Sequence, residues 1–273
     1  MRPWAGPQAG EQTLQGIVKS LWRHPIKGFT PEALDEAVLS EGLCFPCDRL
    51  FAVEDGPSGF DPEAPAHISK RKFTVLAKIA KVAQVRTRFD EATGDLHASL
   101  DDGSWIVARL TETKGREAFA GWLTQVLGDE VNGPLKVLPA PGAHRFMDDA
   151  NGFISIINLA SVRDLAARIG RPVDPRRFRA NLYVEGWPAW SENQASGSTI
   201  SLGEAEAVAV KPITRCMATH VDPATGERDM DVVRSLFEAY GHHHCGLYAR
   251  VTRSGLVELE DAAHIALAES IAA

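Results

Sequence analysis

The chain has 273 residues, enough for one large domain or two smaller ones with buried cores. Its hydrophobic content of 44% and charged content of 24% are ordinary for a globular protein. A formal net charge of −7 argues against a general nucleic-acid binder, which would normally carry a basic face.

Targeting and membrane signals are missing from the sequence. No apolar run approaches the roughly 20 residues that span a bilayer, so no membrane partner is expected. Residues 1–13 contain no stretch of signal-peptide type and are expected to be a disordered lead-in. The cysteines at positions 44, 47, 216 and 245 are too few and too scattered for a disulfide scaffold, which favours a reducing, cytoplasmic location.

The first half of the chain is expected to be rich in strands. Residues 14–28 begin as a strand that breaks at His24-Pro25, and alternating apolar and polar residues predict a meander over 79–110. Residues 114–128 have helical spacing and stop at Gly128. The Pro- and Gly-rich residues 132–152 predict a linker or a long active-site loop.

The second half alternates strands with short helices. A strand at 153–160 precedes a capping box, Ser161 with Asp164, that would open a helix at 162–169. Hairpins are expected to turn at 203–204 and 254–255, and residues 229–240 have helical spacing. Many short strands with few helices indicate a β-barrel-like α+β architecture, mostly β.

Cys216 lies where a structural cysteine is not expected. The segment "KPITRCMATHVDPATGERD" (211–229) places it after a strand end at Pro212 and beside Arg215, ahead of a loop rich in turn formers. A structural cysteine usually sits inside an apolar run, so this thiol is a candidate ligand or nucleophile. The alternative is a packed loop thiol.

Other segments with metal-binding or anion-binding residue types are weaker candidates. Cys44 and Cys47 have CxxC spacing but lack a second CxxC or HxxxH segment, so an incidental role is preferred. In "GHHHCG" (241–246), adjacent side chains diverge, and an exposed helix end explains the histidines better than a metal. Arg177 and Arg179 stand two apart, as on one face of a strand, and suit phosphate or ordinary ion pairs.

Taken in order, several segments resemble one family. They are "HPIKG", "GLCFPCDRLFAVEDG", "ISKRKFTVLAKI", "RFRANLYVEGWPAW", "LGEAEAVAVKPITRC", "VDPATGE" and "CGLYARV". The series resembles the MOSC proteins, named for the C-terminal domain of the molybdenum cofactor sulfurases, over roughly residues 14–262. The resemblance implies a smaller N-terminal β-barrel domain at 14–139, containing the helix at 114–128, and a MOSC domain at 140–273 with a few peripheral helices.

The resemblance also implies a cofactor site. In the branch that includes the mitochondrial amidoxime-reducing component, the cysteine of the RC motif ligates molybdenum, and Cys216 matches it. The molybdenum cofactor (Mo-molybdopterin) would lie between the two domains, and no iron–sulfur cluster is expected in this chain. The matching cofactor-binding positions are Lys27, Gly28, Arg49, Arg179, Asn181, Thr214, Arg215 and Tyr248.

Three functions follow from this resemblance. The first is an oxidoreductase that reduces N-hydroxylated compounds with electrons from a separate ferredoxin or flavoprotein. The second is a sulfur carrier whose Cys216 receives persulfide from a pyridoxal-phosphate-dependent cysteine desulfurase. The third is a cofactor-binding or storage protein without turnover. The first is preferred, because a bare sulfur carrier has no need of an N-terminal barrel and dispersed basic anchors.

Overall fold

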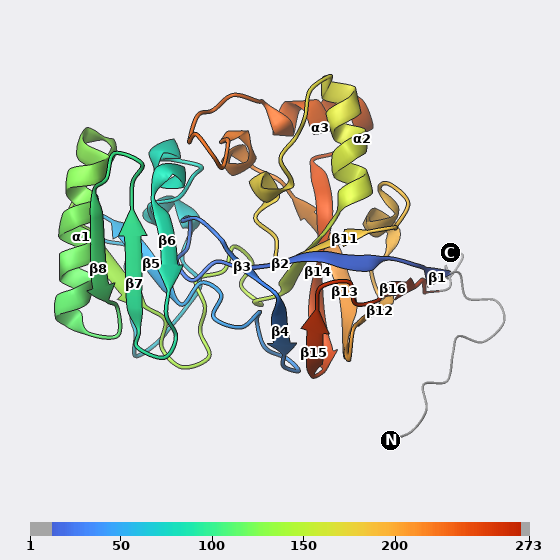
Figure 1. Cartoon of the computed structure of the whole chain (residues 1–273), viewed down its shortest axis with the longest axis horizontal. Helices are drawn as coiled ribbons and strands as arrows, with labels where there is room; N and C mark the ends of the chain where they lie inside the picture. Colours follow the sequence, from blue (N-terminus) through green and yellow to red (C-terminus); the bar gives the residue numbers. More distant parts are fainter. Residues whose placement is uncertain (1–12, 269–273) are drawn as a thin grey trace.

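The computed structural model describes residues 13–268 (Figure 1). The predicted lead-in lies outside the described residues except for Thr13, which begins the first strand. The fold is α+β and mostly β, as predicted from the sequence. Its largest sheet has nine strands, in the order β1 (Thr13–Leu14), β16 (Ala263–Ala266), β12 (Thr199–Leu202), β13 (Ala205–Thr214), β14 (His244–Arg253), β10 (Ile154–Asn158), β11 (Leu182–Glu185), β2 (Ile17–Arg23) and β3 (Glu32–Leu34).

The nine-stranded sheet curls so that β2 approaches the residues just before β16. An isolated antiparallel bridge joins Ile17 to Ala262. The amide of Val18 also donates to the carbonyl of Asp261 at 2.9 Å. The sheet is therefore barrel-like, although β2 and β16 are not paired along their length.

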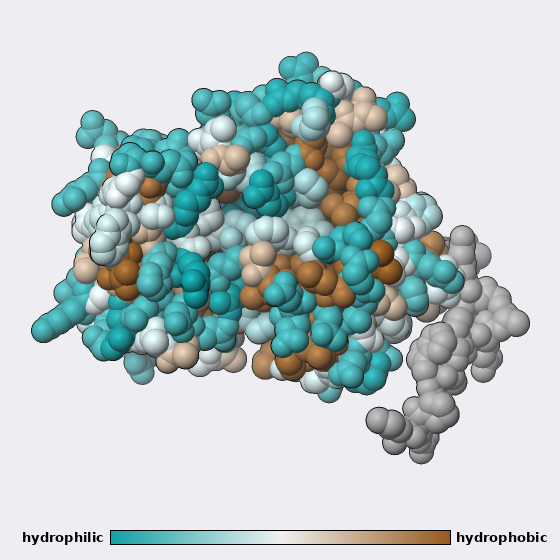
Figure 2. Space-filling view, in the orientation of Figure 1, coloured by the Kyte–Doolittle hydropathy of each residue, from teal (hydrophilic) through white to brown (hydrophobic). Residues whose placement is uncertain are grey.

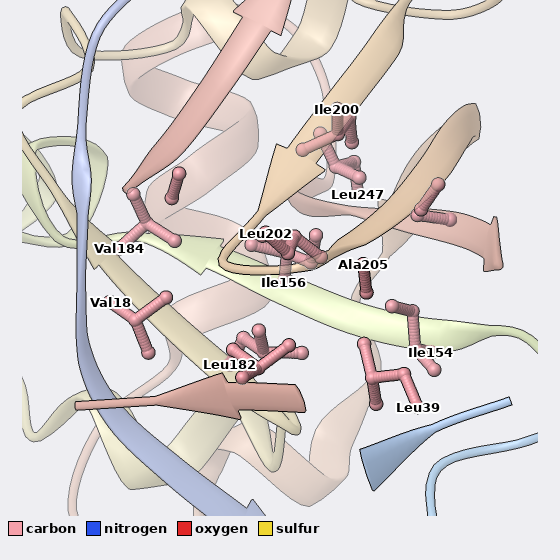
Figure 3. Close-up of a cluster of buried hydrophobic side chains, with 14 of the residues drawn as sticks. Val18, Leu39, Ile154, Ile156, Leu182, Val184, Ile200, Leu202, Ala205 and Leu247 are labelled. Atoms are coloured by element: carbon pink, nitrogen blue, oxygen red, sulfur yellow. The ribbon is translucent and has the colours of Figure 1, made fainter. Parts of the chain in front are cut away.

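Apolar side chains on the inner face of this sheet form its core. Figure 3 shows Ile156, Leu182 and Leu247 gathered between strands that come from distant parts of the sequence. All three are almost fully inaccessible to solvent. Because burial of each such side chain contributes about 1.5–3 kcal/mol, the inner face holds the curled sheet together.

The middle of the chain forms a second group of elements. Strands β6 (Arg86–Phe89), β7 (Asp95–Ser99) and β8 (Trp105–Arg109) make an antiparallel meander, and β5 (Phe51–Asp55) pairs with β9 (Leu135–Pro139). Helix α1 (Thr113–Leu127) packs on β8 and β9 through Phe119 and Leu123. In Figure 1 these elements lie at the end of the molecule opposite β12 and β16.

Two short helices cover one side of the nine-stranded sheet (Figure 1). Helix α2 (Leu159–Ile169) and helix α3 (Val232–Tyr240) contact each other and share a buried cluster that includes Val162 and Leu236. A further 3₁₀ turn at Met217–His220 packs against α3. This contact places the residues that follow Cys216 beside α3.

Glycine signals predicted the helix ends correctly, whereas the capping box was wrong. Helix α2 ends at Gly170, as predicted, and this glycine adopts the left-handed conformation. Helix α2 nevertheless starts earlier, because the side chain of Asn158 accepts a hydrogen bond from the amide of Ala160. The hydroxyl of Ser161 instead donates to Glu192 at 2.7 Å, so it does not cap the helix.

The predicted start of the meander and one predicted hairpin were also wrong. Residues Ala80–Gln84 form a 3₁₀ turn, so the meander begins at Arg86 rather than at 79. Strand β15 (Gly255–Glu258) pairs with β4 (Glu36–Leu39) and not with β14, so residues 254–255 do not close a hairpin. Strand partners that lie more than 200 residues apart leave no local signal in the sequence.

Strands from the first 39 residues join the sheets of the C-terminal half. Strands β1, β2 and β3 lie in the nine-stranded sheet, and β4 pairs with β15. The predicted domain boundary between residues 139 and 140 stays a prediction. Strands from the N-terminal side of this boundary lie in the sheets of the C-terminal half.

One face of the molecule is mainly hydrophilic, with apolar residues gathered at its lower edge over β4 and β15 (Figure 2). Val38 of β4 is 62% exposed there. None of the described helices has the length and apolar character needed to cross a membrane.

Candidate functional site

A cavity of about 320 Å³ brings together residues from both groups of elements. Arg49 and Lys70 come from the first half of the chain, and Arg179, Cys216 and Tyr248 from the second. Its size is at the lower end of the range for small-molecule sites. A larger cavity of about 670 Å³ beside Trp122 contains none of the predicted site residues.

Cys216 is held at the end of strand β13 with its thiol facing Lys70. Its backbone is extended, and its carbonyl accepts hydrogen bonds from the amide and hydroxyl of Thr219 at 3.0 and 2.9 Å. The ammonium of Lys70 donates to Cys216 Sγ at 3.2 Å. The half-buried sulfur is therefore fixed in position, lines the cavity and faces a positive charge.

Asp148 links that ammonium to a second, buried lysine. Its carboxylate hydrogen-bonds Lys27 Nζ and lies 3.8 Å from Lys70 Nζ. Burial opposes the charged form of Asp148, but the two lysines outweigh it and hold its pKa well below the ordinary value. Burial likewise opposes the charge of Lys70, yet Asp148 and Cys216 raise its pKa. A chain of polar contacts therefore leads from Lys27 through Asp148 and Lys70 to the sulfur of Cys216.

A buried network of polar groups holds the guanidinium of Arg49 in position. Its Nη1 contacts the carboxylate of Asp48 and lies 3.1 Å from His24 Nδ1, and its Nη2 donates to the carbonyl of Arg179 at 3.3 Å. Burial, with Arg49 and Arg179 nearby, lowers the pKa of His24 to about 3. His24 is therefore neutral at physiological pH, and its Nδ1 can accept a hydrogen bond from Arg49.

Arg179 lines the cavity, and its side chain carries an unsatisfied donor. It ends the 3₁₀ turn Pro175–Phe178 in a left-handed conformation, with φ of 52°. Its Nη2 is buried and has no hydrogen-bond partner among the described residues. Burial and the charge of Arg49 lower its pKa to about 10. A buried, unpaired guanidinium nitrogen is costly unless an anionic group pairs with it.

Arg215, Thr214 and Tyr248 also line the cavity. Arg215 donates to the carbonyls of Cys245 and Phe178 at 2.6–2.9 Å, so it ties β14 to the turn that carries Arg179. Thr214 is the last residue of β13, and its side chain is exposed. Burial raises the pKa of Tyr248, which keeps its phenol protonated.

Three predicted positions do not line this cavity. Lys27 is 4% exposed and reaches the site through Asp148. Asn181 is fully buried and hydrogen-bonds Ser155, Trp22 and Asp48, so its amide is occupied within the protein. Gly28 has φ of +90°, and a Cβ there would lie 2.5 Å from the carbonyl oxygen of Thr74. The turn therefore requires a glycine at this position.

Arg177 does not share a strand face with Arg179, contrary to the sequence-based interpretation. It lies in the 3₁₀ turn, where its Nη2 contacts the carboxylates of Asp222 and Asp229 at 2.8 Å each. Its Nη1 donates to the carbonyl of His220 at 3.1 Å. The side chain is almost fully buried, and its Nη groups hold the loop that follows Cys216.

Sequence reasoning missed Lys70 and Asp148 as site residues. Lys70 belongs to the basic run "SKRKF", and Asp148 to the long loop "HRFMDDANG". The first segment is part of the family resemblance, and the second belongs to the predicted loop at 132–152. Neither segment shows in the sequence alone which side chain turns toward the sulfur.

The other cysteines lie away from this cavity. Cys44 and Cys47 line a separate hollow of about 370 Å³ with Arg145, and burial raises the pKa of both thiols. Cys245 is fully buried, which raises its pKa to about 12.

The histidine run does not form a metal cluster. His242 stacks on Tyr240 and His244. Within residues 13–268 no group of three or more His, Cys, Asp or Glu side chains is arranged to hold a metal ion.

Solved structures resemble the chain weakly. The YUAD protein from Bacillus subtilis is 13% identical with a TM-score of 0.45, covering 95% of this chain and all of that one. YiiM from Geobacillus stearothermophilus is 22% identical with a TM-score of 0.33, over 42% of this chain and 54% of that one.

Curated relatives match parts of the chain. Mitochondrial amidoxime-reducing component 1 of Mus musculus is 36% identical over 81 residues, which are 30% of this chain and 23% of the relative. Molybdenum cofactor sulfurase of Caenorhabditis briggsae is 34% identical over 117 residues, which are 42% of this chain and 16% of the relative. The matched regions therefore span less than a quarter of either relative.

Family models match most of the chain. The model of the MOSC N-terminal beta barrel domain matches residues 15–130, and that of the MOSC domain matches residues 142–264. The Cys216 cavity takes residues from both matched regions. The chain belongs to the MOSC family.

Proposed function

We propose that this chain is an enzyme that binds the molybdenum cofactor and reduces N-hydroxylated compounds at Cys216. The observation that carries the proposal is that Cys216 lines one cavity with Arg49 and with Arg179, whose buried Nη2 has no hydrogen-bond partner among the described residues. One kind of matched relative is named as an amidoxime-reducing component, which supports this chemistry, and the other is named as a molybdenum cofactor sulfurase, which supports a link to the same cofactor.

The residues of the cavity fit such a cofactor. A cysteine sulfur is a soft ligand suited to a metal that is held by sulfur, and Cys216 would supply one. A pterin with a phosphate group needs several charge-assisted donors, and Arg49 and Arg179 present guanidinium groups from different parts of the chain. The unpaired Arg179 Nη2 is the donor that most needs an anionic partner.

Each residue then has a definable task. Arg49 and Arg179 would bind the phosphate, with Arg49 held in place by Asp48 and His24. Lys70 orients Cys216 Sγ, and Asp148 holds Lys70 in turn. When bound, the cofactor supplies two-electron oxygen-abstraction chemistry. Overall, two electrons and two protons convert an N–OH group to N–H and water, with the electrons coming from a separate ferredoxin or flavoprotein.

The test is to purify the protein, measure its molybdenum content and assay benzamidoxime reduction with reduced methyl viologen. The proposal predicts stoichiometric molybdenum and formation of benzamidine. A molybdenum-loaded protein that forms no benzamidine from any N-hydroxylated compound would instead be a cofactor-binding protein without turnover.

A sulfur carrier is the second candidate, because the half-exposed Cys216 thiol beside Lys70 could also hold a persulfide. Incubation with a cysteine desulfurase and cysteine would then yield a colourless protein that releases thiocyanate with cyanide. All four cysteines are free thiols, which supports a reducing, cytoplasmic location under either function.

A further inference from the structure

A group of cations lies next to residues of the Cys216 cavity, in a chain whose net charge is −7. We call the four residues Lys70, Arg71, Lys72 and Arg228 the basic rim. Lys70, Arg71 and Lys72 form one 3₁₀ turn, and Lys70 contacts Cys216. Arg71 and Lys72 therefore lie directly beside a residue that lines the site.

The basic rim is largely free of compensating carboxylates. Arg71 and Lys72 are exposed, and no described carboxylate lies within ion-pair distance of either. Asp148, which pairs with Lys70, also contacts the buried Lys27. Glu227 is an exposed carboxylate next to Arg228, and it reduces the positive charge without cancelling it.

Arg228 joins the two segments that form the rim. Its exposed guanidinium donates to the carbonyl of Met217 at 3.2 Å and to that of Leu76 at 2.6 Å. The residue after Cys216 and the segment after Lys70 are thus connected on one surface. Met217 is 54% exposed and provides an apolar contact next to the reactive thiol.

We propose that the basic rim and Met217 form the docking surface for a small acidic electron-carrier protein. This inference rests on the proposed reductase function and names the kind of donor that fits it. An apolar contact bordered by charged residues is the usual anatomy of a protein interface. Because the chain as a whole would repel an acidic partner, a local reversal of charge directs that partner to the Cys216 cavity.

The experiment compares two double charge reversals that change the net charge equally. Arg71→Glu/Lys72→Glu alters the rim without touching a residue of the cavity. Arg88→Glu/Lys114→Glu alters two exposed cations on β6 and α1 that also have no described ion pair. Binding of an acidic plant-type [2Fe–2S] ferredoxin to the purified, molybdenum-loaded proteins is measured by calorimetry at low ionic strength.

The rim variant is expected to weaken ferredoxin binding about tenfold or more, and added salt should weaken wild-type binding as well. The control double variant should stay within about twofold of wild type. Equal binding by both double variants, or no ferredoxin binding by the wild type at low salt, would overturn the inference.

A second measurement separates this inference from the proposed function. Reduced methyl viologen is a small cation that needs no docking surface, so the rim variant should reduce benzamidoxime with it as fast as wild type. Failure of the wild type in that assay counts against the reductase proposal. A rim variant that loses activity equally with methyl viologen and with ferredoxin would show damage to the site and overturn the docking role.

Discussion

Lys70 Nζ lies 3.2 Å from Cys216 Sγ, although 146 residues separate the two in the sequence. The contact joins a 3₁₀ turn from the first half of the chain to the end of strand β13. It makes the position of the Cys216 sulfur depend on how the two halves of the chain meet. Asp148 extends the same connection to the buried Lys27.

Replacing Lys70 by methionine should impair the site without unfolding the protein. The change removes a charge-assisted hydrogen bond to Cys216 Sγ, which is worth roughly 1.5–3 kcal/mol. We expect molybdenum content and methyl-viologen-driven turnover to fall about tenfold or more. Lys70→Arg should restore part of both, and Lys72→Met in the same turn should change neither. Wild-type values in Lys70→Met would show that the contact has no role.

Two neighbouring arginines should have separable effects. Arg179→Ala removes a cavity-lining guanidinium with an unpaired donor, so cofactor affinity should drop about ten- to a hundredfold while the fold stays intact. Arg177→Ala leaves Asp222 and Asp229 without their shared partner and should destabilise the fold by on the order of 3 kcal/mol. Urea unfolding and metal analysis of the two variants measure both effects. The assignment fails if Arg179→Ala keeps full molybdenum content and activity.

The sequence predicted those features that depend on local signals. Gly128, Gly170 and Gly241 end the helices because each adopts a positive φ that other residues rarely tolerate. The pairing of β15 with β4 was missed, since its partners are far apart in the chain and a turn at 254–255 looked sufficient.

The same distinction applies to the site. The resemblance supplied Arg49, Arg179, Arg215 and Cys216, all of which line one cavity. It could not supply Lys70, whose role depends on a contact between distant segments. It also grouped Asn181 with the cavity residues, although Asn181 is buried behind them and hydrogen-bonds Asp48, the carboxylate that aims Arg49.

Gly28→Ala should destabilise the protein more than a matched glycine substitution. Both Gly28 and Gly42 have positive φ, but a Cβ at Gly28 would meet the carbonyl oxygen of Thr74 at 2.5 Å and one at Gly42 would meet nothing. Strain from φ alone costs about 1 kcal/mol, and the backbone clash should add at least about 1 kcal/mol more. Urea midpoints of the two variants compare the costs, and equal values would contradict the tight turn.

Stability should depend on the pH through His24. Burial and two arginines lower its folded pKa to about 3, below the ordinary 6.5. The unfolded chain therefore binds a proton that the folded protein does not, and stability is lost as the pH falls from 6.5 toward 3. Between pH 7.5 and pH 5 the loss from His24 should be about 2 kcal/mol.

The asparagine in the His24→Asn variant cannot titrate. Between pH 7.5 and pH 5 the unfolding free energy of this variant should therefore fall by about 2 kcal/mol less than that of wild type. Other histidines contribute equally to both proteins and cancel in the comparison. An identical pH dependence in wild type and variant would mean that His24 is not held neutral in the folded protein.

The most direct test of the account is turnover of Cys216→Ala at molybdenum loading matched to wild type. The variant keeps Arg49 and Arg179 but removes the sulfur that Lys70 holds, so benzamidoxime reduction with methyl viologen should fall to background. Cys44→Ala and Cys47→Ala, which line a different hollow, should retain most activity. Circular dichroism checks that each variant is folded. A folded, molybdenum-loaded Cys216→Ala protein with wild-type turnover would contradict the central claim.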